Sequence, residues 1–246
     1  MIKSLKKAII VILAFFTAAA CITAISITKA KAAGTTVENC GYGLLNGAAV
    51  RIPNAAEDDP GYGLRYTVAM DAEEYNALNA LNIGVRYGLL ITTLENHNNV
   101  PLTEDSVFNN GAYEPNSTVT SKLRVAQIER ETLAEYKGTE DAELIGKRYF
   151  NVSMTNIEGN KSTQFIAVAY IKYNDADGIS CYRFIDSTIE NNARSMAYVA
   201  QLALENEQDI TKIGEENVEL FKNTYINGVT KDVSVELNFS YDGENS

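Results

Sequence analysis

The sequence predicts an α+β fold that is mainly β: an antiparallel, immunoglobulin-like sandwich of seven to eight strands, with a buried helix packed on one sheet. Two observations lead to this prediction. Many segments alternate apolar and polar residues with the period of a half-buried strand. The turns between them are short and rich in Asn, Asp and Gly, as in antiparallel hairpins. An open α+β sheet with the helices on one face is the alternative.

The clearest strand signals lie between Arg148 and Glu205. Residues 148–157, RYFNVSMTNI, alternate and predict a strand with one buried face. Residues 165–173, FIAVAYIKY, are apolar on both parities, which indicates a central strand buried on both faces. Residues 179–185, ISCYRFI, follow a polar turn. We therefore expect three consecutive antiparallel strands here.

A helix is expected directly after these strands. Ser187 and Glu190 have the spacing of a capping box, in which each side chain bonds the backbone of the other residue. The helix should begin there and continue through MAYVAQLAL, residues 196–204, which has almost no polar side. Such a helix is predicted to pack against the sheet.

Weaker patterns complete the framework. Strands are predicted at 45–52, 62–70, 84–93, 122–129 and 231–240, and helices at 71–81 and 213–226. Residues 95–121 are rich in Asn, Pro and Ser, and predict long surface loops with one helical turn near 104–108.

The N-terminus has the three parts of a secretory signal peptide. Lys3, Lys6 and Lys7 precede an apolar run over 8–27, and Ala30-Lys31-Ala32 offers an A-x-A cleavage site. We expect residues 1–32 to be the signal peptide and residues 33–246 a single β-rich extracellular domain. Lipid attachment at Cys21 and an uncleaved membrane anchor are the alternatives. Each of them places the rest of the chain at the cell surface or outside the cell.

The net charge of the chain limits the classes of partner that it is expected to bind. The sequence carries a net charge of −11, and removing the five lysines of the signal peptide takes it to about −16. Such an acidic protein repels nucleic acid and anionic lipid, so neither is an expected partner. Contact with a membrane is expected only through the N-terminal signal or a lipid anchor.

Six segments together resemble a known kind of domain. They are GAAVRI (47–52), GLRYTV (63–68), YGLLITT (87–93), YFNVSMTNI (149–157), FIAVAYIKY (165–173) and IENNARSMAYVAQLAL (189–204). In this order they resemble an uncharacterised β-rich domain found in secreted and cell-surface proteins of Gram-positive anaerobic bacteria. The resemblance implies an extracellular module in an envelope or adhesive setting, and it implies no particular activity.

Catalytic motifs are missing from the sequence. The only histidine is His97, in an Asn-rich loop, and the chain has no G-x-S-x-G, H-E-x-x-H, C-x-x-C or P-loop motif. We expect no cofactor. Glycoside hydrolysis needs only two carboxylates, and Asp186 with Glu190 is the candidate pair. Both acids are also explained as the cap of the following helix.

Tyrosines in loop-like or strand-edge positions are the candidate ligand-binding residues. The chain has no Trp and 14 Tyr. A tyrosine in a polar loop suits recognition of a glycan or protein, whereas one in a core strand, such as Tyr170, is expected to be packed. The candidates are Tyr42, Tyr62, Tyr113 and Tyr136, together with His97.

Two further pairs have structural or metal-binding interpretations. Asp175 and Asp177 vaguely resemble a calcium loop but lack its downstream glutamate, and a hairpin turn explains them more simply. Cys40 and Cys181 remain after signal cleavage, and export permits a disulfide between them. Whether it forms depends on geometry that a sequence does not supply.

These observations favour a non-enzymatic secreted or cell-surface module that binds a glycan or protein of the cell envelope. A carboxylate-dependent glycoside hydrolase and a purely structural module are the alternatives.

Overall fold

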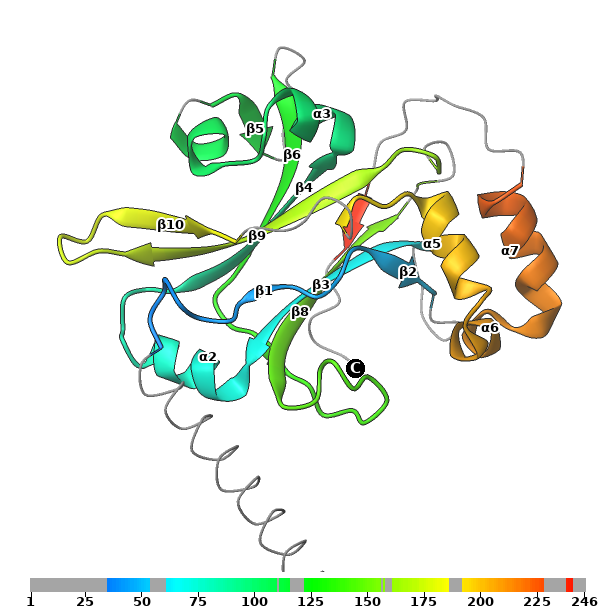
Figure 1. The fold of residues 1–246 in the computed structure, drawn as a ribbon, viewed down its shortest axis with the longest axis horizontal. Helices are drawn as coiled ribbons and strands as arrows, with labels where there is room; N and C mark the ends of the chain where they lie inside the picture. Colours follow the sequence, from blue (N-terminus) through cyan, green and yellow to red (C-terminus); the bar gives the residue numbers. More distant parts are fainter. Residues whose placement is uncertain are drawn as a thin grey trace, which may run out of the picture.

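The computed structural model describes residues 35–53, 61–109, 111–115, 122–155, 157, 161–185, 192–227 and 238–240. In this part of the chain, eleven strands form one sheet of six strands and one of five, with several short helices around them (Figure 1). The predicted α+β class is confirmed. The strands form two sheets, and not the single open sheet considered as the alternative.

The six-stranded sheet, sheet A, is antiparallel. Its order is β1-β3-β8-β11, with β2 also paired to β3 and β7 to β8. β11 ends this order, as expected of an edge strand, although 231–237 of the predicted strand lie outside the described residues. Its strands are β1 (Gly43–Leu44), β2 (Ala49–Arg51), β3 (Gly63–Asp71), β7 (Ala134–Glu135), β8 (Lys147–Thr155) and β11 (Asn238–Ser240).

The five-stranded sheet, sheet B, is mixed and has the order β10-β9-β4-β6-β5. The short β5 runs parallel to β6, and the other neighbours are antiparallel. Its strands are β4 (Arg86–Thr93), β5 (Tyr113–Pro115), β6 (Leu123–Arg130), β9 (Phe165–Asn174) and β10 (Ser180–Phe184).

The main hydrophobic core lies between the two sheets. Alternate residues of β3, among them Leu64 and Val68, share one buried cluster with Leu89 of β4 and Ala169 of β9. The opposite parity of β9 is buried as well, because a second cluster covers part of the other face of sheet B. The prediction that this strand is buried on both faces is therefore confirmed for residues 165–171, whereas Lys172 and Tyr173 are half-buried.

The prediction of three consecutive antiparallel strands is wrong for the first of them. β9 and β10 do form the expected hairpin, but β8 pairs with β3 and β11 in sheet A, and not with β9. Alternation along a strand shows which of its residues share a face, but it does not name the neighbouring strand.

The predicted helix is not continuous: residue 192 is helical, but 193–195 are not, and a separate helix follows. Ser187 and Glu190 lie outside the described residues, but Arg194 is extended and bridges to Phe165, so no continuous helix runs from 189 to 204. The buried amide of Asn192 bonds both the N–H and the C=O of Ala167. The Asn192 side chain and the Arg194 backbone therefore lie along the edge of β9 beyond β10, and α5 (Met196–Ala203) begins after them, capped by Ser195.

The helices lie mainly at the ends of the sheets. α5 packs on β2 and β3 through one side, and α7 packs on α5, while Tyr198 and Leu202 of α5 are exposed (Figure 1). None of the described helices is long and apolar enough to cross a membrane. The other helical segments are α2 (Ala72–Asn79), α3 (Leu94–Asn99), η1 (Asp105–Asn109), α6 (Glu207–Ile213), η3 (Glu215–Asn217) and α7 (Val218–Tyr225).

Gly88, in the middle of β4, is the point of closest approach in sheet B. Tyr170 lies directly opposite on β9, and its ring covers the glycine so closely that a Cβ there would lie 2.2 Å from Cζ. The Gly88 carbonyl also accepts a hydrogen bond of 3.0 Å from the Tyr42 hydroxyl. Only a residue without a side chain fits at this position.

We predict that Gly88→Ala lowers the free energy of unfolding by about 1–3 kcal/mol, because the added methyl group forces the Tyr170 ring off the sheet. Gly43→Ala is the matched control, since its Cβ would meet only Ile185 at an ordinary 3.6 Å and should change stability by less than about 0.5 kcal/mol. Denaturant unfolding measures both. Equal stabilities of the two variants would contradict the close packing.

Candidate functional site

The outer face of sheet B, which points away from sheet A, is only partly covered. The segment containing α3, η1 and β5 packs over one half, where Leu90 and Val168 join a small cluster with Leu102 and Val107. The other half carries polar and aromatic side chains. We call it the polar–aromatic face and define it by Arg86, Phe108, Gln127, Glu129, Glu131, Tyr170, Lys172, Tyr182 and Phe184.

Strand register brings seven of these residues together from four strands, while Phe108 comes from η1 and Glu131 directly follows β6. Lys172 lies opposite both Arg86 and Tyr182, and Gly88 lies opposite both Tyr170 and Glu129. These residues are therefore on the same side of β4, β6, β9 and β10, because side chains of one parity share a face.

A hydrogen-bond network fixes the centre of this face. The Tyr170 hydroxyl donates to Glu129 Oε1 at 2.7 Å, and Gln127 Nε2 donates to the Tyr170 hydroxyl at 2.9 Å and to Glu129 Oε1 at 3.2 Å. Burial, reinforced by the hydrogen bond to Glu129, raises the pKa of Tyr170 far above its ordinary value. The hydroxyl consequently stays protonated and holds the Glu129 carboxylate in one orientation.

Aromatic rings border the network. Phe108 of η1 stacks on Tyr182 with centroids 4.1 Å apart, and Phe184 stacks on Tyr170 at 5.7 Å. The Lys172 ammonium lies 5.7 Å from the Tyr182 centroid, within reach of a cation–π contact. Tyr182, Phe184 and Phe108 are only partly buried, so apolar surface adjoins hydrogen-bonding groups.

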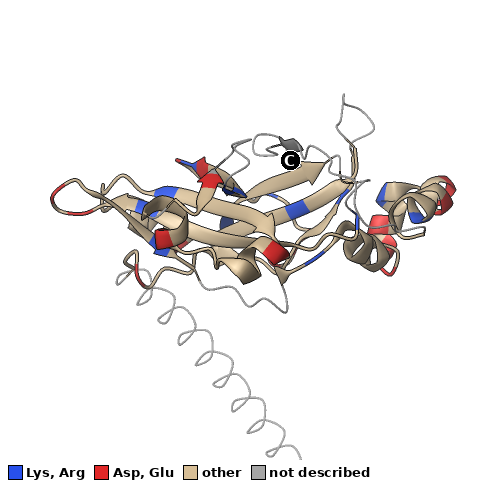
Figure 2. Ribbon diagram, turned by 90° about the horizontal axis from the view of Figure 1, so that it is seen from above, with Lys and Arg blue, Asp and Glu red and all other residues tan. Residues whose placement is uncertain are grey.

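The charges of the polar–aromatic face balance. Arg86 forms an ion pair of 2.6 Å with Glu131, and both side chains are well exposed, so the pair adds little stability. Lys172 and Glu129 supply one further charge of each sign. Acidic residues are conspicuous elsewhere, at the tip of the β9–β10 hairpin and on the α6–α7 end of the molecule (Figure 2). The face is therefore locally neutral on an acidic protein.

Two of the predicted ligand-binding tyrosines are buried. The Tyr42 hydroxyl bonds Gly88, and the Tyr113 hydroxyl donates to the Val100 carbonyl at 2.6 Å. His97 contacts the loop that contains Val100 and Leu102. Its Nδ1 accepts a hydrogen bond of 3.3 Å from the Leu102 N–H, and partial burial lowers the pKa of His97. These contacts hold the loop in place.

The other two predicted tyrosines lie in different parts of the fold. Tyr62 packs against Phe221 and Tyr225 of α7. Tyr136 accepts a hydrogen bond from the Asp141 N–H and meets Tyr149 edge-on. The structure thus does not bring the predicted tyrosines together on one surface.

The candidate catalytic carboxylates and the candidate metal ligands lie in two separate segments of the chain. Asp186 and Glu190 lie outside the described residues. Asp175 Oδ1 accepts from the N–H groups of Asp177 and Ile179, which is the geometry of a side-chain-closed turn. In the part of the chain that the structure describes, no three His, Cys, Asp or Glu side chains gather as metal ligands.

The two cysteines are free thiols in this structure, and no disulfide joins them. Cys40 is buried, and Arg183 Nη1 donates to its carbonyl oxygen and to its Sγ, each at 3.2 Å. Burial raises the pKa of Cys40, so its thiol stays protonated and is a poor nucleophile.

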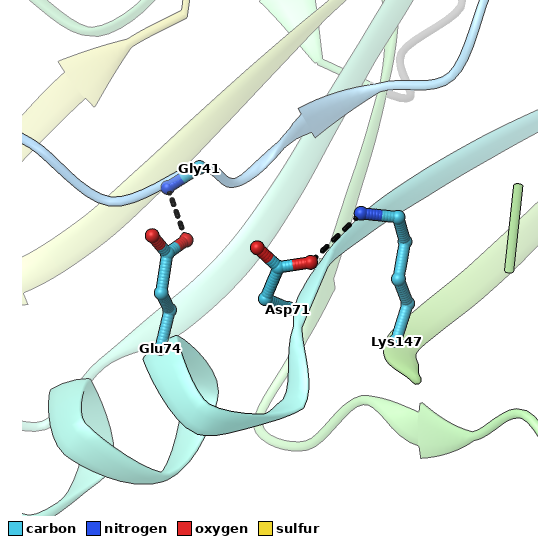
Figure 3. Close-up of polar contacts among 4 residues, drawn as sticks. All are labelled: Gly41, Asp71, Glu74 and Lys147. Carbon is cyan, nitrogen blue, oxygen red and sulfur yellow. Dashed lines mark hydrogen bonds and ion pairs between the residues drawn. The ribbon is translucent and has the colours of Figure 1, made fainter. Parts of the chain in front are cut away.

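Glu74 of α2 is a buried carboxylate with a structural contact. Its Oε2 accepts a hydrogen bond of 2.8 Å from the Gly41 N–H, and nearby Asp71 pairs with Lys147 at 2.9 Å (Figure 3). A Cβ at position 41 would lie 2.7 Å from Oε2, so a larger residue there would displace the Glu74 carboxylate. Glu74 thereby holds the segment before β1 against α2.

The sequence interpretation missed most of the polar–aromatic face. The available signal was the spacing of Gln127 with Glu129 and of Tyr170 with Lys172, two residues apart on otherwise apolar strands. That spacing puts each pair on one face of its strand. It does not show that β6 and β9 flank the same strand, which is what joins the two pairs.

No protein-family model, no curated protein and no solved structure matches this chain.

Two tyrosine-to-phenylalanine substitutions should differ in their effects on stability. Tyr170→Phe removes a charge-assisted bond to Glu129 and should lower the free energy of unfolding by about 1–2 kcal/mol. The Tyr66 hydroxyl is also buried but has no hydrogen-bond partner among the described residues, so Tyr66→Phe should be neutral or stabilising. Denaturant midpoints test this, and the reverse order would contradict the network.

Buried tyrosines should also make the fold sensitive to alkali. Burial raises the pKa of Tyr113 to about 12, and it also raises the pKa of four other tyrosines. Because their pKa is raised on folding, their contribution to stability is intact below pH 10, the ordinary tyrosine pKa, and is lost as the pH rises above it. The other four are Tyr42, Tyr66, Tyr87 and Tyr170.

Denaturant unfolding at several pH values, with phenolate absorbance recorded in parallel, measures this loss. We expect stability to fall above pH 10 and these tyrosines to ionise only as the protein unfolds. Full ionisation of all 14 tyrosines in the folded protein would contradict their burial.

Proposed function

We propose that this protein is a non-enzymatic secreted or cell-surface module that binds a glycan or protein of the cell envelope. The observation that supports it best is the polar–aromatic face, where partly exposed rings adjoin a fixed hydrogen-bond network on a rigid sheet. Binding surfaces combine such aromatic side chains with polar groups at their margin. The signal-peptide pattern of residues 1–32 supports export, and the resemblance of the core segments supports an envelope setting.

The arrangement of the acids favours binding over catalysis. Glu129 accepts hydrogen bonds from Tyr170 and Gln127, and Glu131 is paired with Arg86. A hydrolase of the two-carboxylate type requires one acid to hold a proton for the leaving group. Both carboxylates of this face are instead held by hydrogen bonds or an ion pair within the sheet.

The finer architecture is part of the proposal. We propose that the two facing sheets form an immunoglobulin-like framework, in which the strands provide rigidity and one outer face provides contacts. Largely antiparallel pairing and a core between two sheets support this.

The test is binding of the exported protein to isolated envelope preparations. Tyr182→Ala removes a ring from the polar–aromatic face and should weaken binding at least tenfold, as loss of a central aromatic contact does. Tyr198→Ala is the matched control, because this tyrosine is half exposed on α5, away from the face, and its loss should leave binding unchanged.

Equal loss in both variants, or no binding by the unchanged protein, would contradict the proposal. Hydrolysis of an envelope polysaccharide that is abolished by Asp186→Asn would instead favour the glycoside hydrolase.

A further inference from the structure

We infer that the polar–aromatic face binds an uncharged polysaccharide, with sugar hydroxyls bonded to Glu129 and a sugar ring packed beside Tyr182. This inference rests on the proposed function and names the partner of the same site. The observations that support it are the balance of charge on the face, an unused carboxylate oxygen and the ring that Lys172 covers.

The balance of charge selects against ionic partners. Arg86 and Lys172 are matched by Glu129 and Glu131, so an anionic glycan would meet two carboxylates and a cationic one would meet two cations. Burying an unmatched charge against either pair is costly. Electrostatic complementarity therefore favours a ligand that is polar but uncharged.

Glu129 provides the hydrogen-bonding contact. The two hydrogen bonds that reach its carboxylate, from Tyr170 and Gln127, both end at Oε1, and no described residue donates to Oε2. An ionised carboxylate accepts about four hydrogen bonds, so Oε2 and the second lone pairs are available to donors from solution. Sugar hydroxyls are such donors, and the fixed orientation of the carboxylate reduces the entropy that is lost on binding.

Tyr182 provides the apolar contact. Phe108 stacks on its ring, the Tyr170 ring lies at 6.2 Å between centroids, and the Lys172 ammonium is the charged group near it. A cation–π contact at a partly exposed site is weak, of the order of 0.5–1 kcal/mol, so a ligand can displace the ammonium from the ring. A sugar presents C–H groups on its ring face and oxygens at its edge, which suits the aromatic ring and the displaced ammonium together.

The experiment uses isolated Gram-positive cell envelope as the probe, treated with protease or with periodate, or assayed at high salt. Protease removes protein partners, periodate cleaves the vicinal diols of sugars, and raising the salt concentration from about 0.05 to about 0.5 M screens ionic contacts. We expect binding of the exported protein to survive protease and high salt, and to be lost after periodate. Soluble polygalacturonate, an anionic polysaccharide, should not compete.

Three variants test whether this binding takes place at the polar–aromatic face. Glu129→Gln should weaken binding about tenfold through loss of the charged acceptor. Tyr182→Phe keeps the ring and should bind nearly as well as the unchanged protein, whereas Tyr182→Ala should not. Circular dichroism and thermal melting show which variants are folded, and the comparison of Phe with Ala at position 182 stands even if Glu129→Gln fails to fold.

Failure of the uncharged-polysaccharide inference can be distinguished from failure of the proposed function. Binding that depends on Tyr182 but is lost with protease, or lost in high salt, overturns the uncharged polysaccharide and leaves the proposed function intact. Binding unaffected by Tyr182→Ala, or no binding to any envelope form, overturns both.

Discussion

The fold depends on one close approach at the centre of sheet B, where Gly88 leaves the backbone of β4 uncovered. The Tyr170 ring takes the space that a side chain would need, and the Tyr42 hydroxyl bonds the Gly88 carbonyl. Because the ring crosses β4, its hydroxyl reaches Gln127 and Glu129 on β6. Because Gly88 has no side chain, contacts at this one position link the segment before β1 to the centre of sheet B and to the polar–aromatic face.

The sequence predicts the faces of strands better than their neighbours. Burial of β9 on both sides follows from its apolar residues on both parities, and β3 lies where its alternation indicates. The pairing of β8 with β3 does not follow, because the alternation in β8 would fit either sheet. Likewise, Ser187 and Glu190 have the spacing of a cap, yet extended pairing of Arg194 with Phe165 determines where α5 begins.

The candidate site was harder to predict because burial depends on tertiary contacts. Tyr42 and Tyr113 have neighbours typical of loops, but their hydroxyls satisfy backbone carbonyls inside the fold. Gln127 and Glu129 have the pattern of an ordinary solvated strand face. They become a site only because Tyr170, two strands away, crosses Gly88 to reach them, and a two-residue spacing contains no information about that crossing.

The segment between β4 and β6 both stabilises sheet B and shapes its binding surface. Leu102 and Val107 bury one half of the outer face, and the same segment places Phe108 against Tyr182 at the border of the open half. Covering the whole face would bury Glu129 and Lys172 away from solvent, at a cost that their contacts could not offset. Leaving it wholly open would expose the rings. Partial cover therefore keeps the charges hydrated and the rings packed, and it produces a polar network beside an aromatic edge, an arrangement suited to contact with a partner.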